Sequence, residues 1–162
     1  MLLNLIILLN KKMTISPSRI FFDTNVYIIG FATPESDEFR CLQWAGLGMK
    51  QSSLIEVVIS EILLEEILRV AKRLRNKDWS GEIIDRIWQD FQVCYVLLDE
   101  NELEIIENLG NIPREDAGVY LTAKTGKAQC FVSANYKLVK AIVEKTGEFE
   151  CLTPEAFVNK YI

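Results

Sequence analysis

The sequence contains no histidine among its 162 residues. Histidine is the usual general base at neutral pH and a common zinc ligand, so its absence excludes His-based triads and the usual zinc and copper sites. The sequence also has no C-x-x-C pair, and its cysteines are widely spaced among apolar neighbours: Cys41, Cys94, Cys130 and Cys151. We interpret them as small core residues of a reduced, cytoplasmic protein, with a disulfide as the minority alternative.

Excess positive charge and long apolar segments are lacking too. The net charge is -5, so a nucleic-acid partner would need a local basic patch or bound metal ions to offset phosphate repulsion. The apolar run at residues 2–9 is too short to span a bilayer and lacks a signal-peptide pattern, so we expect no membrane association. We expect residues 1–18 to be an N-terminal extension or a mis-assigned start, and residues 19–162 to form a single domain.

Short apolar runs alternate with helical patterns along the rest of the chain. The runs predict buried strands at residues 20–22, 54–59, 93–98, 129–133 and 149–152. Helices are predicted at residues 38–47, 61–75, from Ser80 onward, 101–109, 115–124, 135–145 and 154–162, with residues 30–37 as a loop. This alternation predicts an α/β fold with a mainly parallel central sheet and helices on both faces.

Three polar residues, Asp23, Thr24 and Asn25, directly follow the first predicted strand. In open α/β sheets the ligand crevice lies at the carboxyl ends of the strands, which is where this segment would lie. A carboxylate buried there is costly unless a cation pairs with it. Asp23 is therefore a candidate site residue, with a helix N-cap or a turn as the alternative role.

Glu66 falls on the core-facing side of the long helix predicted at residues 61–75. At roughly 100° per residue it lies between Ile62 and Val70. An acid in that position needs a reason. It is either a site residue or one half of a buried ion pair with Arg69 or Arg73.

Asp116 likewise faces inward on its helix, beside Val119 and Ala123. Its alternative role is to complement the helix dipole in the first turn. Ser133 and Asn135 follow the fourth strand, at the same edge of the sheet as Asp23. These residues could therefore converge on one crevice.

Three buried carboxylates cannot all stay ionised side by side without a cation. Ligands that are all oxygen suit Mg²⁺ or Mn²⁺. Such a site can activate a water molecule and stabilise in-line attack on a phosphodiester. The residues by themselves thus indicate a metal-dependent hydrolase of phosphodiesters.

The chain resembles PIN-domain ribonucleases, such as the toxins of bacterial toxin–antitoxin modules, in five motifs: FFDTNVYI, VVISEILLEEIL, REDAGVYLTAK, FVSANYKLV and LTPEAF. The motifs occur in the family's order and span nearly all of residues 19–162. The resemblance implies a three-layer α/β/α sandwich and endoribonuclease activity. It implies that Asp23, Glu66 and Asp116 bind metal and that Ser133 is the small hydroxyl residue beside the site. It further implies an RNA substrate, an antitoxin protein and a homodimer as partners.

Asn135 stands where the family usually has a fourth acid, two residues after Ser133. Its amide oxygen can ligate a cation or orient water, but it brings no charge. We predict catalytic and metal-binding roles for Asp23, Glu66, Asp116 and Asn135, with Thr24, Asn25 and Ser133 shaping the site. Because Asn135 replaces the usual acid, an alternative stays open: the protein is a PIN-like module that binds RNA or a protein without cutting. A phosphatase or DNA nuclease is a third alternative, disfavoured by the lack of a Gly-rich loop and a D-x-D pair.

Five cations occur within nine residues at 69–77, with no acid among them. We predict that four of them bind nucleic acid: Arg69, Lys72, Arg73 and Arg75. The alternative is a solvated helix end whose charges suit the negative end of the helix dipole.

Overall fold

The computed structural model describes residues 2–4 and 15–162. A single five-stranded sheet runs through this part of the chain in the order β3-β2-β1-β4-β5, with every pair of neighbours parallel. The strands are β1 (Arg19–Phe22), β2 (Glu56–Ser60), β3 (Gln92–Val96), β4 (Cys130–Val132) and β5 (Glu150–Leu152). The predicted α/β class, with a parallel sheet, is confirmed.

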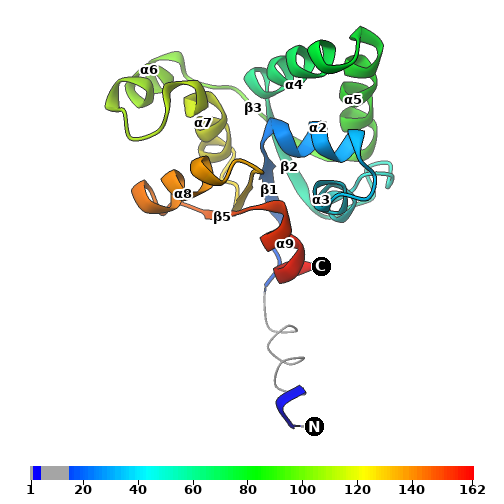
Figure 1. Cartoon of the computed structure of the whole chain (residues 1–162). Helices are drawn as coiled ribbons and strands as arrows, with labels where there is room; N and C mark the ends of the chain where they lie inside the picture. Colours follow the sequence, from blue (N-terminus) through cyan, green and yellow to red (C-terminus); the bar gives the residue numbers. More distant parts are fainter. Residues whose placement is uncertain (1, 5–14) are drawn as a thin grey trace.

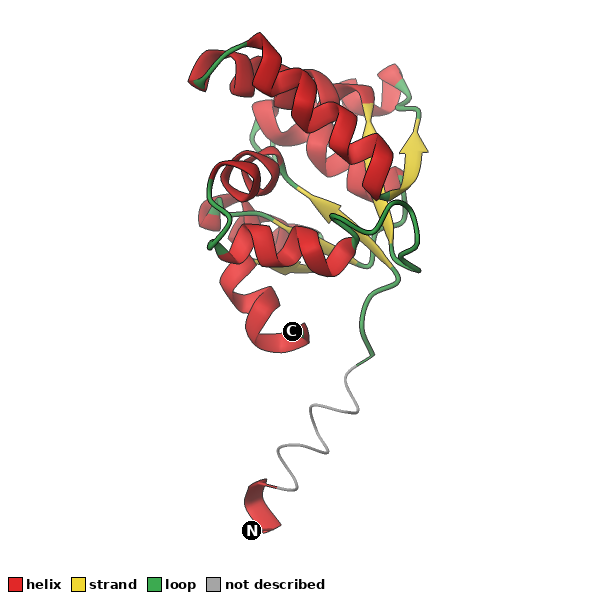
Figure 2. Ribbon diagram, turned by 90° about the vertical axis from the view of Figure 1, so that its right-hand side faces the viewer, coloured by secondary structure: helices red, strands yellow, loops and turns green. Residues whose placement is uncertain are grey.

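Helices cover both faces of the sheet (Figure 1). One side carries α2 (Thr24–Ala32), α3 (Asp37–Ala45), α4 (Glu61–Leu74) and α5 (Lys77–Asp90). The other side carries α6 (Glu100–Leu109), the short 3-10 helix η1 (Arg114–Asp116), α7 (Ala117–Thr125) and α8 (Tyr136–Lys145). The last helix, α9 (Pro154–Tyr161), packs against α3. Figure 2 shows the strands running between these helical layers, which together form the expected α/β/α sandwich.

The core is built around β1, the central strand. Ile20, Phe21 and Phe22 are all fully buried, as expected for a parallel strand covered on both faces. The ring of Phe21 stacks on that of Phe131 in β4, with centroids 4.8 Å apart. The continuous apolar run in the sequence thus reflects packing on both sides of the sheet.

The helices α2 and α5 differ from the sequence prediction. Residues 30–32, which were predicted as part of a loop, belong to α2, which begins at Thr24 with Asp23 as its N-cap. This helix is apolar nearly all round its surface, so it lacks the polar stripe that reveals an amphipathic helix. The next long helix, α5, begins at Lys77 rather than near Ser80, because the Asn76 side chain caps it by accepting from the Trp79 N–H at 2.8 Å.

Some large apolar side chains on the helices α4 and α5 are exposed. Leu74 is 59% exposed because it is the last residue of α4, where the chain turns into α5. Trp88 is 42% exposed and packs beside Tyr95, with ring centroids 6.0 Å apart. The helix predicted at residues 115–124 also begins later, because η1 precedes α7.

All four cysteines are free thiols, and none but Cys94 is more than slightly exposed. Within residues 2–4 and 15–162, no helix has the length and apolar character needed to cross a membrane. The apolar run predicted at residues 2–9 lies mostly outside the described residues.

Candidate functional site

Acids from three separate segments line one pocket of about 250 Å³ at the carboxyl end of β1. They are Asp23 after β1, Glu66 on α4 and Asp116 at the end of η1. The rest of the lining comes from Thr24, Asn25, Ile28, Ile29, Val70 and Asn135. The pocket therefore brings together all but one of the site residues predicted from the sequence. Its apolar wall was not predicted, because those residues looked like ordinary core positions.

The carboxylate of Asp23 is held by three hydrogen-bond donors. Its Oδ1 accepts from the Thr24 N–H at 2.8 Å, and its Oδ2 accepts from the Ser133 hydroxyl at 2.7 Å and the Asn25 side-chain amide at 3.2 Å. The side chain is 6% exposed. Asp23 is thus both the N-cap of α2 and part of the pocket lining. Its capping role, which the sequence offered as an alternative, is compatible with a role in the site.

Asn25 links the ends of β1 and β4. Its Oδ1 accepts from the Ala134 N–H at 2.9 Å, while its Nδ2 donates to the Ser133 hydroxyl at 3.2 Å as well as to Asp23. The Ser133 hydroxyl also accepts from the Asn135 N–H at 3.0 Å. Ser133 lies beneath the pocket rather than in its lining, and it acts on the site through Asp23.

Burial raises the pKa values of all three acids, and the charges of neighbouring acids add to this effect for Glu66 and Asp116. Burial raises the pKa of Asp23. Burial, followed by the negative charge of Asp23, raises the pKa of Glu66. Burial, followed by the charges of Asp23, Glu115 and Glu66, raises the pKa of Asp116 to about 6. The pocket therefore concentrates negative charge that the surrounding protein does not neutralise.

The alternative roles for Glu66 and Asp116 find limited support. Among the ion pairs of the described residues, none involves Asp23, Glu66 or Asp116, although the Thr24 side chain and, after it, the Arg69 charge lower the pKa of Glu66. A buried ion pair with Arg69 or Arg73 therefore does not explain Glu66. Asp116 does lie at the N-terminus of α7, where the dipole favours it, but its side chain makes no capping hydrogen bond.

The donor set of the pocket suits a hard divalent cation. It consists of carboxylate oxygens and the buried Thr24 hydroxyl, which makes no hydrogen bond of standard geometry in the described part of the chain, although it lies near enough to Glu66 to lower the pKa of that acid. No three Asp, Glu or Cys side chains of residues 2–4 and 15–162 are already gathered into a complete metal cluster.

Asn135 lines the pocket but is also the N-cap of α8. Its Oδ1 accepts from the Leu138 N–H at 3.3 Å. The same amide oxygen that we predict as a ligand is thus already used by the helix. Its metal-binding role stays a prediction.

The basic residues predicted to bind nucleic acid continue along α4 beyond the pocket. Arg69, Lys72, Arg73 and Arg75 are all exposed. Arg75 differs from the others because its guanidinium carbon lies 4.4 Å from the centre of the Trp79 ring. The positions fit a positively charged path leading away from the acids, and the nucleic-acid role remains a prediction.

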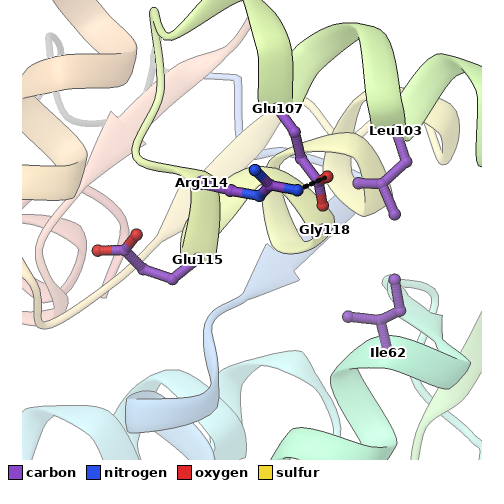
Figure 3. Close-up of a pocket in the computed structure, with 6 residues that line it drawn as sticks. All are labelled: Ile62, Leu103, Glu107, Arg114, Glu115 and Gly118. Atoms are coloured by element: carbon purple, nitrogen blue, oxygen red, sulfur yellow. Dashed lines mark ion pairs between the residues drawn. The ribbon is translucent and has the colours of Figure 1, made fainter.

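A larger cavity of about 490 Å³ lies beside the candidate site, between α4, α6 and α7 (Figure 3). It contains the ion pair between Arg114 and Glu107, at 3.5 Å, with Ile62 across from them. Glu115 borders it and is adjacent in sequence to Asp116, but none of the three acids of the candidate site lines it. The candidate site is therefore chosen for its three carboxylates and not for its size.

Comparison with known proteins agrees with this architecture. A chain of the crystal structure of VapBC2 from Rickettsia felis, bound to a DNA fragment from their promoter, superposes with a TM-score of 0.56 at 12% identity, covering 83% of this chain and 98% of that chain. No curated protein sequence matches the chain. The family profile described as PIN domain matches residues 19–137, which is most of the sequence. The chain therefore belongs to the PIN domain family.

Proposed function

We propose that the protein is a metal-dependent endoribonuclease that hydrolyses RNA phosphodiesters at the pocket lined by Asp23, Glu66 and Asp116. The observation that carries this proposal is the convergence of three acids from distant segments on one pocket, with raised pKa values and no ion-pair partner among the described residues. Such an arrangement is costly for stability, which favours a function that supplies the missing cation.

Asp23, Glu66 and Asp116 would hold Mg²⁺ or Mn²⁺, with Asn135 as an additional oxygen donor. A cation bound there would offset the carboxylate charges and polarise both water and a phosphate oxygen. The chain's own contribution is orientation, because Ser133 and Asn25 fix the Asp23 carboxylate. Exposed cations on α4 would bind the flanking phosphates.

The fold supports a narrower form of this proposal, in which the protein is the toxin of a toxin–antitoxin pair in the cytoplasm. The support is the similarity in fold to a chain of the VapBC2 structure. An antitoxin and a second copy of the chain would then be its protein partners.

One observation favours a second function, a PIN-like module that binds RNA or a protein without cutting. The pocket has three carboxylates, and the amide oxygen of Asn135 caps a helix. Because this pocket has one acid fewer than is usual in the family, it would hold a second cation more weakly.

Glu66 and Glu65 provide the matched pair that tests the proposal. Both lie on α4, but Glu66 is half-buried in the pocket lining and Glu65 is exposed. We expect Glu66→Gln to lower Mn²⁺-dependent cleavage of single-stranded RNA by at least about 100-fold, more than the loss of a group that only supports a ligand. Glu65→Gln should cleave like the wild type.

Equal cleavage by both variants would refute the nuclease proposal. RNA binding by the wild type without cleavage at any Mg²⁺ or Mn²⁺ concentration would favour the binding module instead. The two functions are therefore separated by one titration of metal against labelled RNA.

A further inference from the structure

Besides the acid pocket and the cavity of Figure 3, a further cavity of about 310 Å³, called the second cavity below, lies between α2, the end of α4 and α5. It is lined by two aromatic rings, two guanidinium groups, one carboxylate and one aliphatic side chain: Phe31, Trp79, Arg75, Arg86, Glu82 and Ile83. Combined aromatic and arginine side chains are typical of surfaces that bind unpaired nucleobases.

Arg75 and Trp79 form a ready-made stacking surface. The Arg75 guanidinium lies over the Trp79 ring at 4.4 Å. Trp79 is half-buried and packs against the core, while Arg75 is exposed. The ring thus holds the guanidinium in place, and the outer face of that planar group can receive a base.

Arg86 is oriented by a buried acid on the other side of the cavity. Its Nε donates to Asp90 at 3.1 Å, and Asp90 is 4% exposed and also accepts from the Gly48 N–H at 2.9 Å. This hydrogen bond uses only one edge of the guanidinium. The Nη groups of Arg86 are therefore not needed for it and can bind a phosphate.

The charge of this region is opposite to that of the whole chain. The protein carries a net charge of -5, yet residues 69–77 contain five cations and no acid, and the cavity itself is lined by two arginines, Arg75 and Arg86, against one acid, Glu82. A negatively charged polymer is therefore attracted to this corner rather than to the molecule in general.

The second cavity and the acid pocket lie along the same two helices, α2 and α4. In α2, Ile28 and Ile29 line the acid pocket and Phe31 lines the second cavity. On α4, Glu66 lines the acid pocket, and Arg75 follows the helix end. Nine residues of helix separate Glu66 from Arg75 by about 14 Å, which corresponds to about four stacked nucleotides. Figure 1 shows α2, α4 and α5 together on one side of the molecule.

We propose that this cavity is a subsite for one unpaired base of the RNA that is cleaved at the acid pocket. The base stacks on the outer face of the Arg75 guanidinium, which the Trp79 ring holds in place, and Arg86 binds an adjacent phosphate. That the bound RNA is also the RNA that is cleaved rests on the proposed nuclease function. Paired bases are excluded because both of their faces are covered in a duplex.

Fluorescence anisotropy with a labelled eight-nucleotide single-stranded RNA, in EDTA so that no cleavage occurs, tests the subsite. We expect Trp79→Leu and Arg75→Gln each to weaken binding by at least about five-fold, as for the loss of one stacked base. Trp88→Leu is the control on the same helix, and Arg40→Gln is the control for an exposed arginine. Both controls should bind like the wild type.

Abasic substitutions identify the base. One position of the RNA should lose affinity for the wild type when its base is removed, and the same RNA should show no further loss with Trp79→Leu. Unchanged RNA binding by both variants would overturn the proposal. The alternative ligand would then be an apolar side chain of a protein partner. Equal affinity for duplex RNA would also overturn it, because phosphate contacts alone would then explain binding.

The test is independent of the nuclease proposal. If the stacking effect is found but no metal supports cleavage, the subsite stands and the nuclease fails. If Glu66→Gln abolishes cleavage while Trp79→Leu and Arg75→Gln leave affinity unchanged, the nuclease stands and the subsite fails. Thermal unfolding establishes whether Trp79→Leu is folded, and Arg75→Gln, at an exposed position, decides the outcome if it is not.

Discussion

The Ser133 hydroxyl donates to Asp23 Oδ2 at 2.7 Å across 110 positions of sequence. The sheet creates this contact, because β1 and β4 are parallel neighbours with Phe22 opposite Val132. Asp23 and Ser133 are the next residues along the two strands, so their side chains meet where the strands end. The position of the main acid is therefore set by strand register rather than by a loop.

Ser133→Ala should lower both the kcat/KM for RNA cleavage and the free energy of unfolding. The substitution leaves Asp23 with two of its three donors, so its carboxylate is less well oriented and its pKa rises further. We expect kcat/KM for RNA cleavage to fall by about ten-fold and the free energy of unfolding to fall by about 1 kcal/mol. Steady-state cleavage and urea denaturation measure the two effects.

Ser80→Ala is the matched control for Ser133→Ala. Ser80 is another buried serine, and its hydroxyl donates to the Lys77 carbonyl at 2.7 Å within α5. Its loss should cost stability and leave kcat/KM unchanged. If Ser133→Ala behaves in the same way, the hydroxyl has no role in orienting Asp23.

Asp116→Asn should stabilise the protein at neutral pH while it impairs metal binding. The folded-state pKa of about 6 lies above the ordinary value of 3.8, so the folded protein binds this proton more readily than the unfolded chain does. The wild type therefore loses stability as the pH rises from about 4 to about 6, and above that range the variant should be more stable by about 1 kcal/mol. Urea denaturation of both proteins at acidic and neutral pH measures this difference.

The difference between Asp116→Asn and the wild type should vanish below about pH 4, where both side chains are neutral. Glu115→Gln is the neighbouring comparison: Glu115 is exposed and acts on Asp116 only through its charge, so this variant should gain less stability at neutral pH than Asp116→Asn does. A neutral-pH stability of Asp116→Asn equal to or below that of the wild type would contradict the assignment of Asp116 to a repulsive cluster.

A divalent cation should reverse the same instability. Mn²⁺ at about 100 times its Kd should raise the free energy of unfolding of the wild type by about 2.7 kcal/mol. EDTA should abolish the increase, and Glu66→Gln should reduce it. Thermal unfolding with and without Mn²⁺ provides the measurement, and an equal shift in both proteins would place the cation elsewhere.

The sequence allowed the sheet to be predicted because buried parallel strands are continuous apolar runs, as at residues 20–22. It also allowed the inward-facing acids to be identified, because an acid such as Glu66 interrupts an apolar helix face. The helix α2 was not predicted, since its residues are apolar on nearly every side. The Arg75–Trp79 contact was not predicted either, because it depends on α5 starting at Lys77 and on how two helices meet. Helical periodicity carries information about burial, but not about contacts between elements.

Tyr27→Phe should leave stability unchanged or increase it. The Tyr27 hydroxyl is fully buried and has no hydrogen-bond partner among the described residues. Removing an unsatisfied polar atom avoids its desolvation cost, for an expected gain of about 1 kcal/mol in the free energy of unfolding. Urea denaturation measures this gain, and a loss of more than about 1 kcal/mol would show that the hydroxyl is satisfied, for example by buried water.

Asn135→Asp distinguishes the nuclease from the binding module. Aspartate caps helices as well as asparagine does, so α8 should keep its hydrogen bond to the Leu138 N–H and the fold should not change. The new carboxylate adds negative charge to the pocket, so calorimetry should show tighter Mn²⁺ binding and thermal unfolding should show lower stability without metal. If the wild type is a weakened nuclease, cleavage should increase in the variant at limiting Mn²⁺. If Mn²⁺ affinity and cleavage both remain those of the wild type, residue 135 does not reach the cation, and the three acids alone determine what the site can do.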